Sequence, residues 1–411
     1  MDFGMIEDML KDEQQAPTDI KVIGVGGAGG NAVNRMIASG LKKVTFVAMN
    51  TDVQALQRSN AQIRMPIGKD LTGGLGAGGV PEVGEKAAEE TTEEIEELLK
   101  GTDMVFITAG MGGGTGTGAT PVVAEISRSL DVLTVAVVTT PFAFEGRKKI
   151  LLAQAGIDKL RKQVDTLILI PNQYLLKVAE NNTPIKQAFM MADDVLRQGV
   201  QGISELITEP GEINIDFADV RTVMKGKGDA LMGIGIGEGA NRAVDAARQA
   251  ISNPLLENAH ISGAQSVLVN LAGGDGLTLQ EYQDVVELIT ENCDPDALII
   301  AGQAYNPELG EKIKVTVVAT GFVSDNKEDF DSIKAKQKRF DKVSEGPKTE
   351  NEVDKNSNDS ENEEKKTDYI TINRWQDLQA QLNMKSGNKD YSTPAVLRYQ
   401  QNNKDHNGNE E

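Results

Sequence analysis

The sequence AGMGGGTGTG, at residues 109–118, decides the fold of this chain. It follows an apolar run at residues 104–108 and precedes a segment with the apolar spacing of a helix. Glycine amides approach an anion closely because no Cβ intervenes, and the start of the following helix attracts negative charge. Pro121 suits the first turn of that helix. A flexible linker seldom lies between an apolar strand and an apolar helix, so we predict a phosphate-binding loop.

Strand and helix patterns alternate on both sides of this loop. Such alternation predicts right-handed crossovers and a parallel sheet with helices on both faces. Ligands bind such sheets beyond the carboxyl ends of the strands, where this sequence gathers its glycines. In the first half we predict a helix at 31–38 and strands at 20–25, 44–49, 132–139 and 166–171.

A long helical pattern at residues 183–207 joins this half to a second unit. Thr183 resembles an N-cap, and Pro184 resembles the first helical residue. Beyond it we predict a smaller α/β domain with a mixed sheet, and we interpret Gly233 and Gly235 as turns or bulges. Its predicted elements are strands at 230–236, 266–271, 297–301 and 313–320, and helices at 240–251 and 279–292.

The composition excludes several classes of function. The 411 residues carry a formal net charge of −20, which opposes binding to nucleic acid or anionic lipid through broad electrostatics. The single cysteine, Cys293, allows no disulfide within the chain and no cysteine cluster for a metal. The acidic N-terminus lacks a signal-peptide pattern, and we find no bilayer-spanning run, so we expect a cytoplasmic protein without direct membrane insertion.

A second glycine cluster leaves two interpretations open. Gly24, Gly26 and Gly29 have the G-x-G-x-x-G spacing, which together with Asp52 suggests an NAD-dependent oxidoreductase. That interpretation leaves the denser cluster at 112–118 unexplained, whereas a nucleoside triphosphate offers phosphate oxygens for both loops. A third glycine-rich turn at 73–79 could close over the terminal phosphate. The sequence contains no G-x-x-x-x-G-K-[ST] motif of a P-loop.

Three residues suit recognition of a guanine base. A carboxylate can accept both donors of guanine, and Asp193 on the long helix is the candidate. Phe189 lies one turn earlier and could stack on the base, while Asn172 follows a strand and could bind its polar edge. The structural alternatives are core packing for Phe189 and a solvated helix face for Asp193.

The segment around residue 216 suits water activation. Asn214, Asp216 and Asp219 place an amide and two carboxylates at a predicted helix start. Carboxylates polarise an attacking water and help to hold Mg²⁺. The alternative is that Asp216 is only an N-cap and Asp219 only a favourable first-turn acid.

With these motifs in place, residues 20–322 resemble the FtsZ family of tubulin-like cell-division GTPases. Residues 112–118 are similar to the family's signature loop and 214–219 to its synergy loop. The resemblance implies binding of GTP or GDP with Mg²⁺, and no dedicated protein metal site. The residues that it places at the nucleotide are Gly27, Ala28, Gly29, Gly30, Asn31, Gly114, Thr115, Gly116, Glu145, Lys149, Asn172, Phe189 and Asp193.

The resemblance also implies self-assembly. Asp216 and Asp219 would act on the nucleotide of the next copy in a head-to-tail homopolymer, with Asn214 as a further catalytic candidate. An interface that does not close can build such a polymer without limit. The filament would be the scaffold of the cytokinetic Z ring, at midcell beneath the inner membrane. Lys149 stands where the family often has Arg, and Ala28 and Gly30 vary the first loop.

The C-terminal region has its own expected role. Residues 324–388 are rich in Asp, Glu, Lys, Asn and Ser, which predicts a disordered acidic linker. Trp375 lies in a short pattern of weakly helical spacing that could fold on a partner. Near the end, the sequence resembles the family peptide that docks membrane-anchoring and regulatory proteins. The docking residues would be Pro394, Ala395, Val396, Leu397 and Arg398.

These patterns together define a domain organisation. We predict a tubulin-like α/β GTPase domain, a long connecting helix, a smaller α/β domain and a tail. The predicted boundaries are a flexible arm at 1–18, a GTP-binding domain at 19–182, the connecting helix at 183–207, a second domain at 208–323, the linker at 324–388, the docking peptide at 389–401 and a variable end at 402–411.

Overall fold

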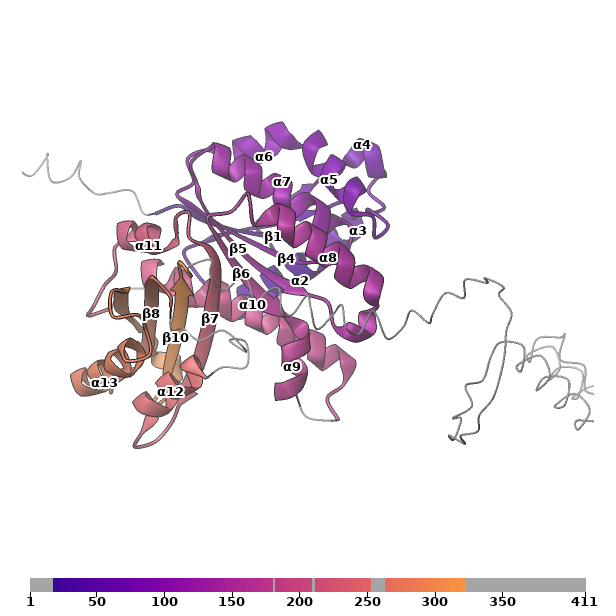
Figure 1. The fold of residues 1–411 in the computed structure, drawn as a ribbon. Helices are drawn as coiled ribbons and strands as arrows, with labels where there is room; N and C mark the ends of the chain where they lie inside the picture. Colours follow the sequence, from indigo (N-terminus) through magenta and orange to yellow (C-terminus); the bar gives the residue numbers. More distant parts are fainter. Residues whose placement is uncertain (1–17, 180–181, 209–210, 253–262, 323–411) are drawn as a thin grey trace, which may run out of the picture. The chain divides into compact units, whose positions relative to one another are not determined.

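The computed structural model describes residues 18–322 apart from 180–181, 209–210 and 253–262. Figure 1 shows the order of its elements. The strands are β1 (Ile20–Val25), β2 (Thr45–Asn50), β3 (Ile63–Pro66), β4 (Met104–Gly110), β5 (Leu133–Thr140), β6 (Thr166–Pro171), β7 (Gly228–Gly237), β8 (Ser266–Gly273), β9 (Leu298–Tyr305) and β10 (Ile313–Thr320). The helices are α2 (Gly26–Ala38), α3 (Val53–Gln57), α4 (Lys69–Thr72), α5 (Pro81–Glu90), α6 (Thr92–Leu99), α7 (Thr115–Ser129), α8 (Arg147–Leu160), α9 (Asn172–Val178), α10 (Ile185–Thr208), α11 (Phe217–Met224), α12 (Arg242–Ile251) and α13 (Leu279–Thr290).

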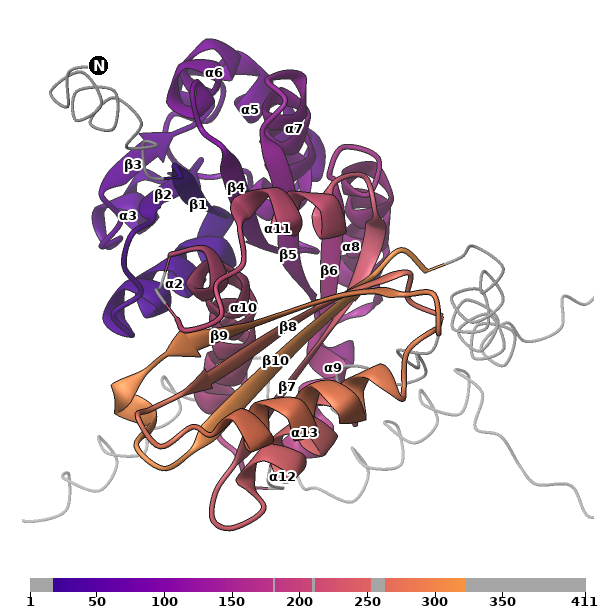
Figure 2. The same cartoon turned by 90° about the vertical axis from the view of Figure 1, so that its left-hand side faces the viewer.

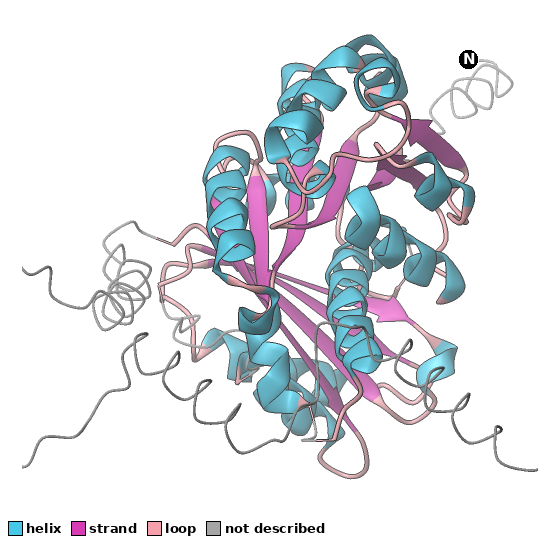
Figure 3. Cartoon of the chain, turned by 90° about the vertical axis from the view of Figure 1, so that its right-hand side faces the viewer, coloured by secondary structure: helices cyan, strands magenta, loops and turns pink. Residues whose placement is uncertain are grey.

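The first half forms the predicted parallel sheet. Its strand order is β3-β2-β1-β4-β5-β6, and every neighbouring pair is parallel. Helices cover both faces of this sheet, as Figures 1 and 3 show. The strand order reverses direction between β1 and β4, and this switch point is where open α/β sheets bind ligands.

The strand sequences are apolar without a polar alternation because both faces of this sheet are buried. In β1, Val22 belongs to the core with α2 and α10, while the next residue, Ile23, belongs to the core with α5 to α8. Successive side chains of a strand point to opposite faces, so one apolar run serves two cores. The glycine loops after β1 and β4 are therefore held on a rigid base.

The second half contains the predicted mixed sheet. Its order is β7-β10-β8-β9, with β10 antiparallel to both neighbours and β8 parallel to β9. Figure 2 shows α12 and α13 on one face of this sheet. The other face packs on α10, because Met232, Leu268 and Val318 share a core with Leu196 and Val200 of that helix. A short parallel pairing of β6 with β7 links the two sheets.

Several local predictions were wrong. The first helix begins at Gly26, inside the glycine cluster, and not at Asn31. Pro121 lies inside α7, past its first turn, because the helix already begins at Thr115. Pro184 precedes α10, and its carbonyl accepts a hydrogen bond from Ala188 N at 3.0 Å.

Gly233 and Gly235 are neither turns nor bulges. Both lie inside β7, in register with Val317 and Val315 of β10. A Cβ on Gly235 would lie 2.0 Å from the carbonyl oxygen of Ala246 in α12. The missing side chain therefore lets a helix lie directly on the strand.

Several predicted features lie outside the described residues. These are most of the N-terminal arm, the linker at 324–388 with Trp375, the docking peptide at 389–401 with Pro394, Ala395, Val396, Leu397 and Arg398, and the end at 402–411. Within the described part of the chain, no helix has both the length and the apolar character needed to cross a bilayer.

Candidate functional site: a nucleotide pocket at the switch point

The two glycine loops meet at the switch point of the first sheet. The first opens α2 directly after β1, and the second lies between β4 and α7. A Cβ on Gly26 would lie 2.9 Å from the backbone nitrogen of Gly116, and one on Gly110 would lie 2.7 Å from the Cβ of Ala28. Gly26 also has a φ of +74°, which favours glycine. The loops are thus in contact, although their residues are about ninety positions apart.

The N-termini of α2 and α7 lie side by side at these loops. Among the residues that the structure describes, no side chain caps either N-terminus, and no acidic residue lies in the first turn of either helix. Their first amide groups therefore have no helical acceptor, and both helix dipoles favour an anion there. A polyphosphate fits this arrangement.

The glycines of the loops divide into two groups. Gly29 and Gly116 are buried by close packing, because a Cβ on either would lie 2.3 or 2.6 Å from a carbonyl oxygen of β4. A Cβ on Gly27, Gly30 or Gly113 would meet no atom within 4 Å. The first group holds the loops together, and the second group faces space that a ligand can occupy.

The remaining loop residues also gather here. Gly114 lies at the N-cap of α7, and a Cβ on it would lie 2.8 Å from the Cβ of Ala77. The third glycine turn therefore lies against the second loop. The hydroxyl of Thr115 lies 2.7 Å from that of Thr51 at the end of β2. Asn31 is exposed on α2.

Glu145 and Lys149 lie beside the second loop. Lys149 Nζ is 3.1 Å from Glu145 Oε2, while Glu145 Oε1 accepts a hydrogen bond from Phe142 N at 2.9 Å. A Cβ on Gly112 would lie 2.9 Å from the Lys149 carbonyl oxygen. The ammonium group is half exposed, so it can approach an anionic ligand.

Asn172 and Phe189 border the same region. Asn172 begins α9 directly after β6, is buried, and its Oδ1 has no hydrogen-bond partner among the described residues. A buried amide oxygen without a partner is costly, and a ligand donor would satisfy it. Phe189 packs edge-on against Phe142, with the ring centroids 5.4 Å apart, but the residue remains 38% exposed. Part of its ring is therefore available to stack on a ligand.

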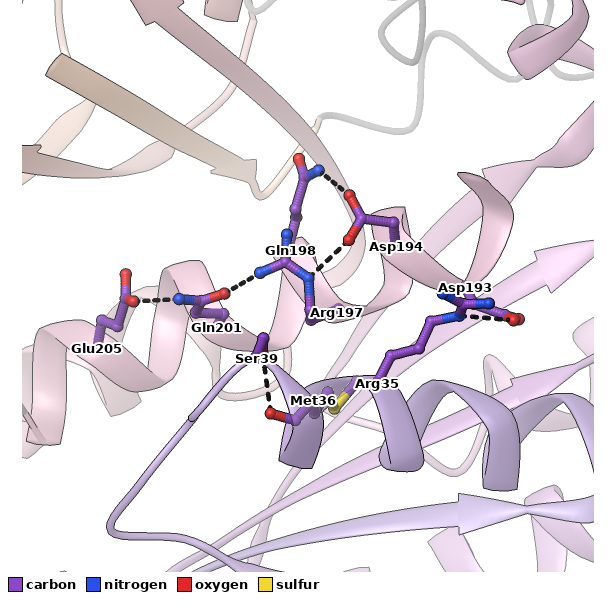
Figure 4. Close-up of polar contacts among 9 residues, drawn as sticks. All are labelled: Arg35, Met36, Ser39, Asp193, Asp194, Arg197, Gln198, Gln201 and Glu205. Atoms are coloured by element: carbon purple, nitrogen blue, oxygen red, sulfur yellow. Dashed lines mark hydrogen bonds and ion pairs between the residues drawn. The ribbon is translucent and has the colours of Figure 1, made fainter. Parts of the chain in front are cut away.

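Asp193 is not on a solvated face. Its side chain is 15% exposed, and its Oδ2 accepts a hydrogen bond from Arg35 Nε at 3.0 Å (Figure 4). Burial raises the pKa of this carboxyl, and Arg35 acts in the opposite direction. No local sequence pattern indicates Arg35, because the fold pairs this residue of α2 with a residue of α10 that lies 158 positions away.

A row of polar contacts continues along α10 from this point (Figure 4). Asp194 binds Arg197 at 2.7 Å, Arg197 donates to Gln201, and Gln201 donates to Glu205. Glu205 Oε2 lies 3.6 Å from Lys314 Nζ in β10, and burial lowers the pKa of Lys314 while Glu205 opposes that effect. The row therefore links the helix of the pocket to the second domain.

Asn214, Asp216 and Asp219 are not brought to these loops. All three are exposed at the start of α11, and Asp216 occupies the N-cap position without a capping hydrogen bond from its side chain. Asn214 Oδ1 accepts a bond from Gly211 N at 2.8 Å. The far end of α11 is bonded to the residues that precede β5 and β6, Asp131 and Asp165.

The acids thus lie at the amino edge of the sheet. The glycine loops follow the carboxyl ends of the parallel strands β1 and β4. A seven-residue strand such as β4 spans about 20 Å at ~3.3 Å per residue. In a single copy, the acids are therefore separated from the glycine loops by about the length of a strand.

Asp52 is the N-cap residue of α3. Its Oδ1 accepts hydrogen bonds from Gln54 N and Ala55 N and so caps α3. In the part of the chain that the structure describes, no group of three or more His, Cys, Asp or Glu residues could hold a metal ion.

Comparison with known proteins identifies the family. Residues 19–180 match the model "Tubulin/FtsZ family, GTPase domain", and residues 228–323 match "FtsZ family, C-terminal domain". The structure described as "FtsZ dimer, empty" from M. jannaschii is 45% identical, with a TM-score of 0.73 over 77% of this chain and 92% of that chain. CetZ2 from Haloferax volcanii, as a GTPgS-bound protofilament, is 22% identical with a TM-score of 0.64 over 79% and 99%, and so shares the fold.

These findings exclude the interpretation as an NAD-dependent oxidoreductase. The G-x-G-x-x-G spacing belongs instead to one of two loops of a guanine-nucleotide site, and Asp52 is a helix cap. The chain binds guanine nucleotide, hydrolyses GTP and self-assembles, and it belongs to the FtsZ family of tubulin-like GTPases that act in cell division.

Proposed function

We propose that copies of this chain assemble head to tail and that each GTP is hydrolysed between two of them. One copy supplies the glycine loops, and its neighbour supplies Asp216, Asp219 and Asn214. The observation that carries this proposal is the placement of the acids at the opposite sheet edge from the loops, exposed and unused by their own nucleotide site. The dimer and protofilament described for related proteins are consistent with it.

Within the pocket, each group has a separate task. The amides of Gly27 to Asn31 and of Gly114 to Gly116 bind the phosphates, with Lys149 and Glu145 on the ribose and phosphate side. Asp193 accepts the two donors of guanine, and Arg35 keeps its carboxylate charged and directed. Phe189 stacks on the base, and the unpartnered Oδ1 of Asn172 binds its polar edge.

Magnesium accompanies the triphosphate in this proposal. Magnesium in proteins usually keeps several waters and is held by one or two carboxylates together with substrate phosphates. The hydroxyls of Thr51 and Thr115 beside the loops and the incoming carboxylate of Asp216 are the protein oxygens available to it. The ion would neutralise charge on the phosphates.

The filament would serve as the cytokinetic ring scaffold at midcell. The peptide at residues 389–401 would dock membrane-anchoring and regulatory proteins, so that attachment to the membrane is indirect. The net charge of −20 favours such indirect attachment over direct contact with anionic lipid.

Assembly and hydrolysis can be tested together. Light scattering and phosphate release are measured with GTP, GDP and ATP over a series of protein concentrations. We expect scattering and phosphate release with GTP alone, and release that rises more than linearly with protein concentration. Strictly linear release, or equal activity with ATP, would contradict the proposal.

A further inference from the structure

Helix α11 is fastened at its C-terminal end. The carbonyl oxygen of Met224 accepts a hydrogen bond from Thr166 Oγ1 in β6 at 2.5 Å, and that of Val223 accepts one from Thr320 Oγ1 in β10 at 2.8 Å. Both threonines are fully buried. These bonds cap the helix end with groups from the sheets of both domains. The residues that precede the opposite end, which carries the acids, are bonded to β9: Glu212 N donates to Gln303 Oε1 at 2.8 Å, and Gln303 N donates to the Ile213 carbonyl at 2.9 Å.

Asp131 holds the exposed side of the same helix. This residue lies in the turn between α7 and β5. Its Oδ2 lies 2.7 Å from Arg221 Nη2 and its Oδ1 lies 2.8 Å from Lys225 Nζ. Its carbonyl oxygen also accepts a bond from Arg221 at 3.3 Å. The hydrogen bond from Lys225 and the charges of both cations hold the pKa of Asp131 below its ordinary value.

The backbone at Asp131 has a conformation in which glycine is the usual residue. Asp131 follows the C-cap of α7 with a φ of +56°, a left-handed conformation. Its amide bonds to the Arg128 carbonyl at 3.1 Å, and Val132 N bonds to the Ser127 carbonyl at 3.2 Å. This is the Schellman helix end, in which glycine is the usual residue because it has no Cβ to strain. An aspartate here bears a conformational cost that glycine avoids, and it gains two cations of α11.

We propose that Asp131 is a positioning residue for hydrolysis. Through Arg221 and Lys225 it fixes the direction of α11, and thereby the place at which Asp216 and Asp219 reach the nucleotide of the neighbouring copy. This inference rests on the proposed function, in which those acids act across the interface.

A small change in the direction of α11 is enough to displace the acids. The eight residues of α11 span about 12 Å, so a tilt of about 5° about its fastened end moves the acids by about 1 Å. A misplacement of ~1 Å can lower a catalytic rate by as much as about 100-fold. An isolated surface ion pair often has no measurable effect, but here one carboxylate binds two cations on a single helix.

The test compares Asp131→Gly and Asp131→Asn in the full chain. Glycine removes the carboxylate and relieves the backbone, whereas asparagine tolerates the left-handed conformation and keeps one acceptor. For Asp131→Gly we expect an unchanged or higher melting temperature, unchanged GTP binding, amide exchange about threefold faster at residues 217–224 in the GDP-bound unassembled protein, and turnover in filaments lowered three- to tenfold. Asp131→Asn should lie between this variant and the unaltered chain.

Two controls separate the possible failures. Asp158→Asn removes another exposed acid that is paired with an arginine, Arg161, and should leave exchange and turnover unchanged. Unchanged exchange or unchanged turnover in Asp131→Gly, alongside lost turnover in Asp216→Ala, would overturn the role of Asp131 alone. Full turnover in Asp216→Ala would overturn the proposed function and, with it, the link from Asp131 to hydrolysis.

Discussion

The two edges of the first sheet carry different groups: the carboxyl edge has closely packed glycine loops, and the amino edge has exposed carboxylates. At the carboxyl edge, the glycine backbones of two loops pack so closely that a Cβ on Gly26 would lie 2.9 Å from the backbone nitrogen of Gly116. At the amino edge, Asp216 and Asp219 are exposed. Under the proposed function, the first edge binds the phosphates, whereas the second edge presents carboxylates to the nucleotide of another copy. Under this proposal, one copy therefore supplies half of the hydrolytic site.

The substitution Asp216→Ala gives the largest expected difference between the two edges, because it should affect turnover and not GTP affinity. It should lower GTP turnover by on the order of 100-fold or more, because a group that orients the attacking water is lost. GTP affinity should stay within about twofold, since the altered residue lies at the opposite edge from the pocket of its own copy. Turnover by phosphate release and affinity by equilibrium titration provide the two measurements.

The matched control for that variant is Glu212→Ala. Glu212 is an exposed acid of the same loop, and its backbone amide donates a hydrogen bond to Gln303 Oε1. Turnover should remain close to that of the unaltered chain. An equal loss in both variants would show that the acidic loop contributes charge and not a specific carboxylate.

A pair of glycine variants tests the packing of the carboxyl edge. A Cβ on Gly118 would lie 1.9 Å from the Pro81 carbonyl oxygen of α5, so Gly118→Ala should destabilise the fold by about 3 kcal/mol. Gly113→Ala meets no atom within 4 Å, so its melting temperature should be unchanged while GTP affinity falls by about tenfold. Thermal unfolding and GTP titration distinguish the two. Equal melting temperatures for both variants would contradict the division of the glycines.

The substitution Asp193→Asn tests whether the buried carboxylate serves the ligand. Loss of a charged acceptor should lower GTP affinity by about 2 kcal/mol, or roughly 30-fold. Burial raises the pKa of Asp193 in the folded chain above its ordinary value of 3.8. At a pH between 3.8 and the raised pKa, the folded chain therefore holds more protons than the unfolded chain. Stability therefore falls as pH rises through this window, and the ionised group costs stability above it.

Asp193→Asn should accordingly keep or slightly raise the melting temperature at pH 7. Melting curves between pH 4 and pH 7 check the direction of this pH dependence. The variant should lack the loss of stability that ionisation of Asp193 causes as the pH rises. A melting temperature that falls along with affinity would show that the Arg35 ion pair is structural.

The smallest expected effect comes from Lys149→Ala. The ammonium group is half exposed and already paired with Glu145, so its loss should weaken GTP binding by only about 1 kcal/mol. Titration at two salt concentrations measures it, and the difference from the unaltered chain should shrink at high salt. A loss that is equal at both salt concentrations would contradict a charge contact with phosphate.

The sequence predicted the regular parts of the fold closely where apolar runs end sharply. The ranges predicted for β1, β6 and β10 agree with the structure at both ends. Gly233 and Gly235 were misinterpreted because glycine inside a strand looks like a turn until the helix above it is known. Pro121 was misplaced because α7 begins within the glycine cluster itself, before any capping residue.

The sequence suggests candidate site residues where they belong to local motifs. Both glycine loops, Asp193 and the acids near α11 were selected from short patterns. Arg35 and Asp131 were missed, because each acts through partners about 90 to 160 positions away that only the fold brings close. No periodicity or spacing carries such a signal.

The central claim is tested most directly by mixing two inactive variants. Asp216→Ala with Asp219→Ala keeps an intact pocket but lacks the acids, whereas Asp193→Ala keeps the acids but binds GTP poorly. Each should be nearly inactive alone in phosphate release. An equal mixture should recover about a quarter of the turnover of the unaltered chain, because one junction in four joins a good pocket to good acids. Turnover no greater than the sum of the separate variants would contradict the account.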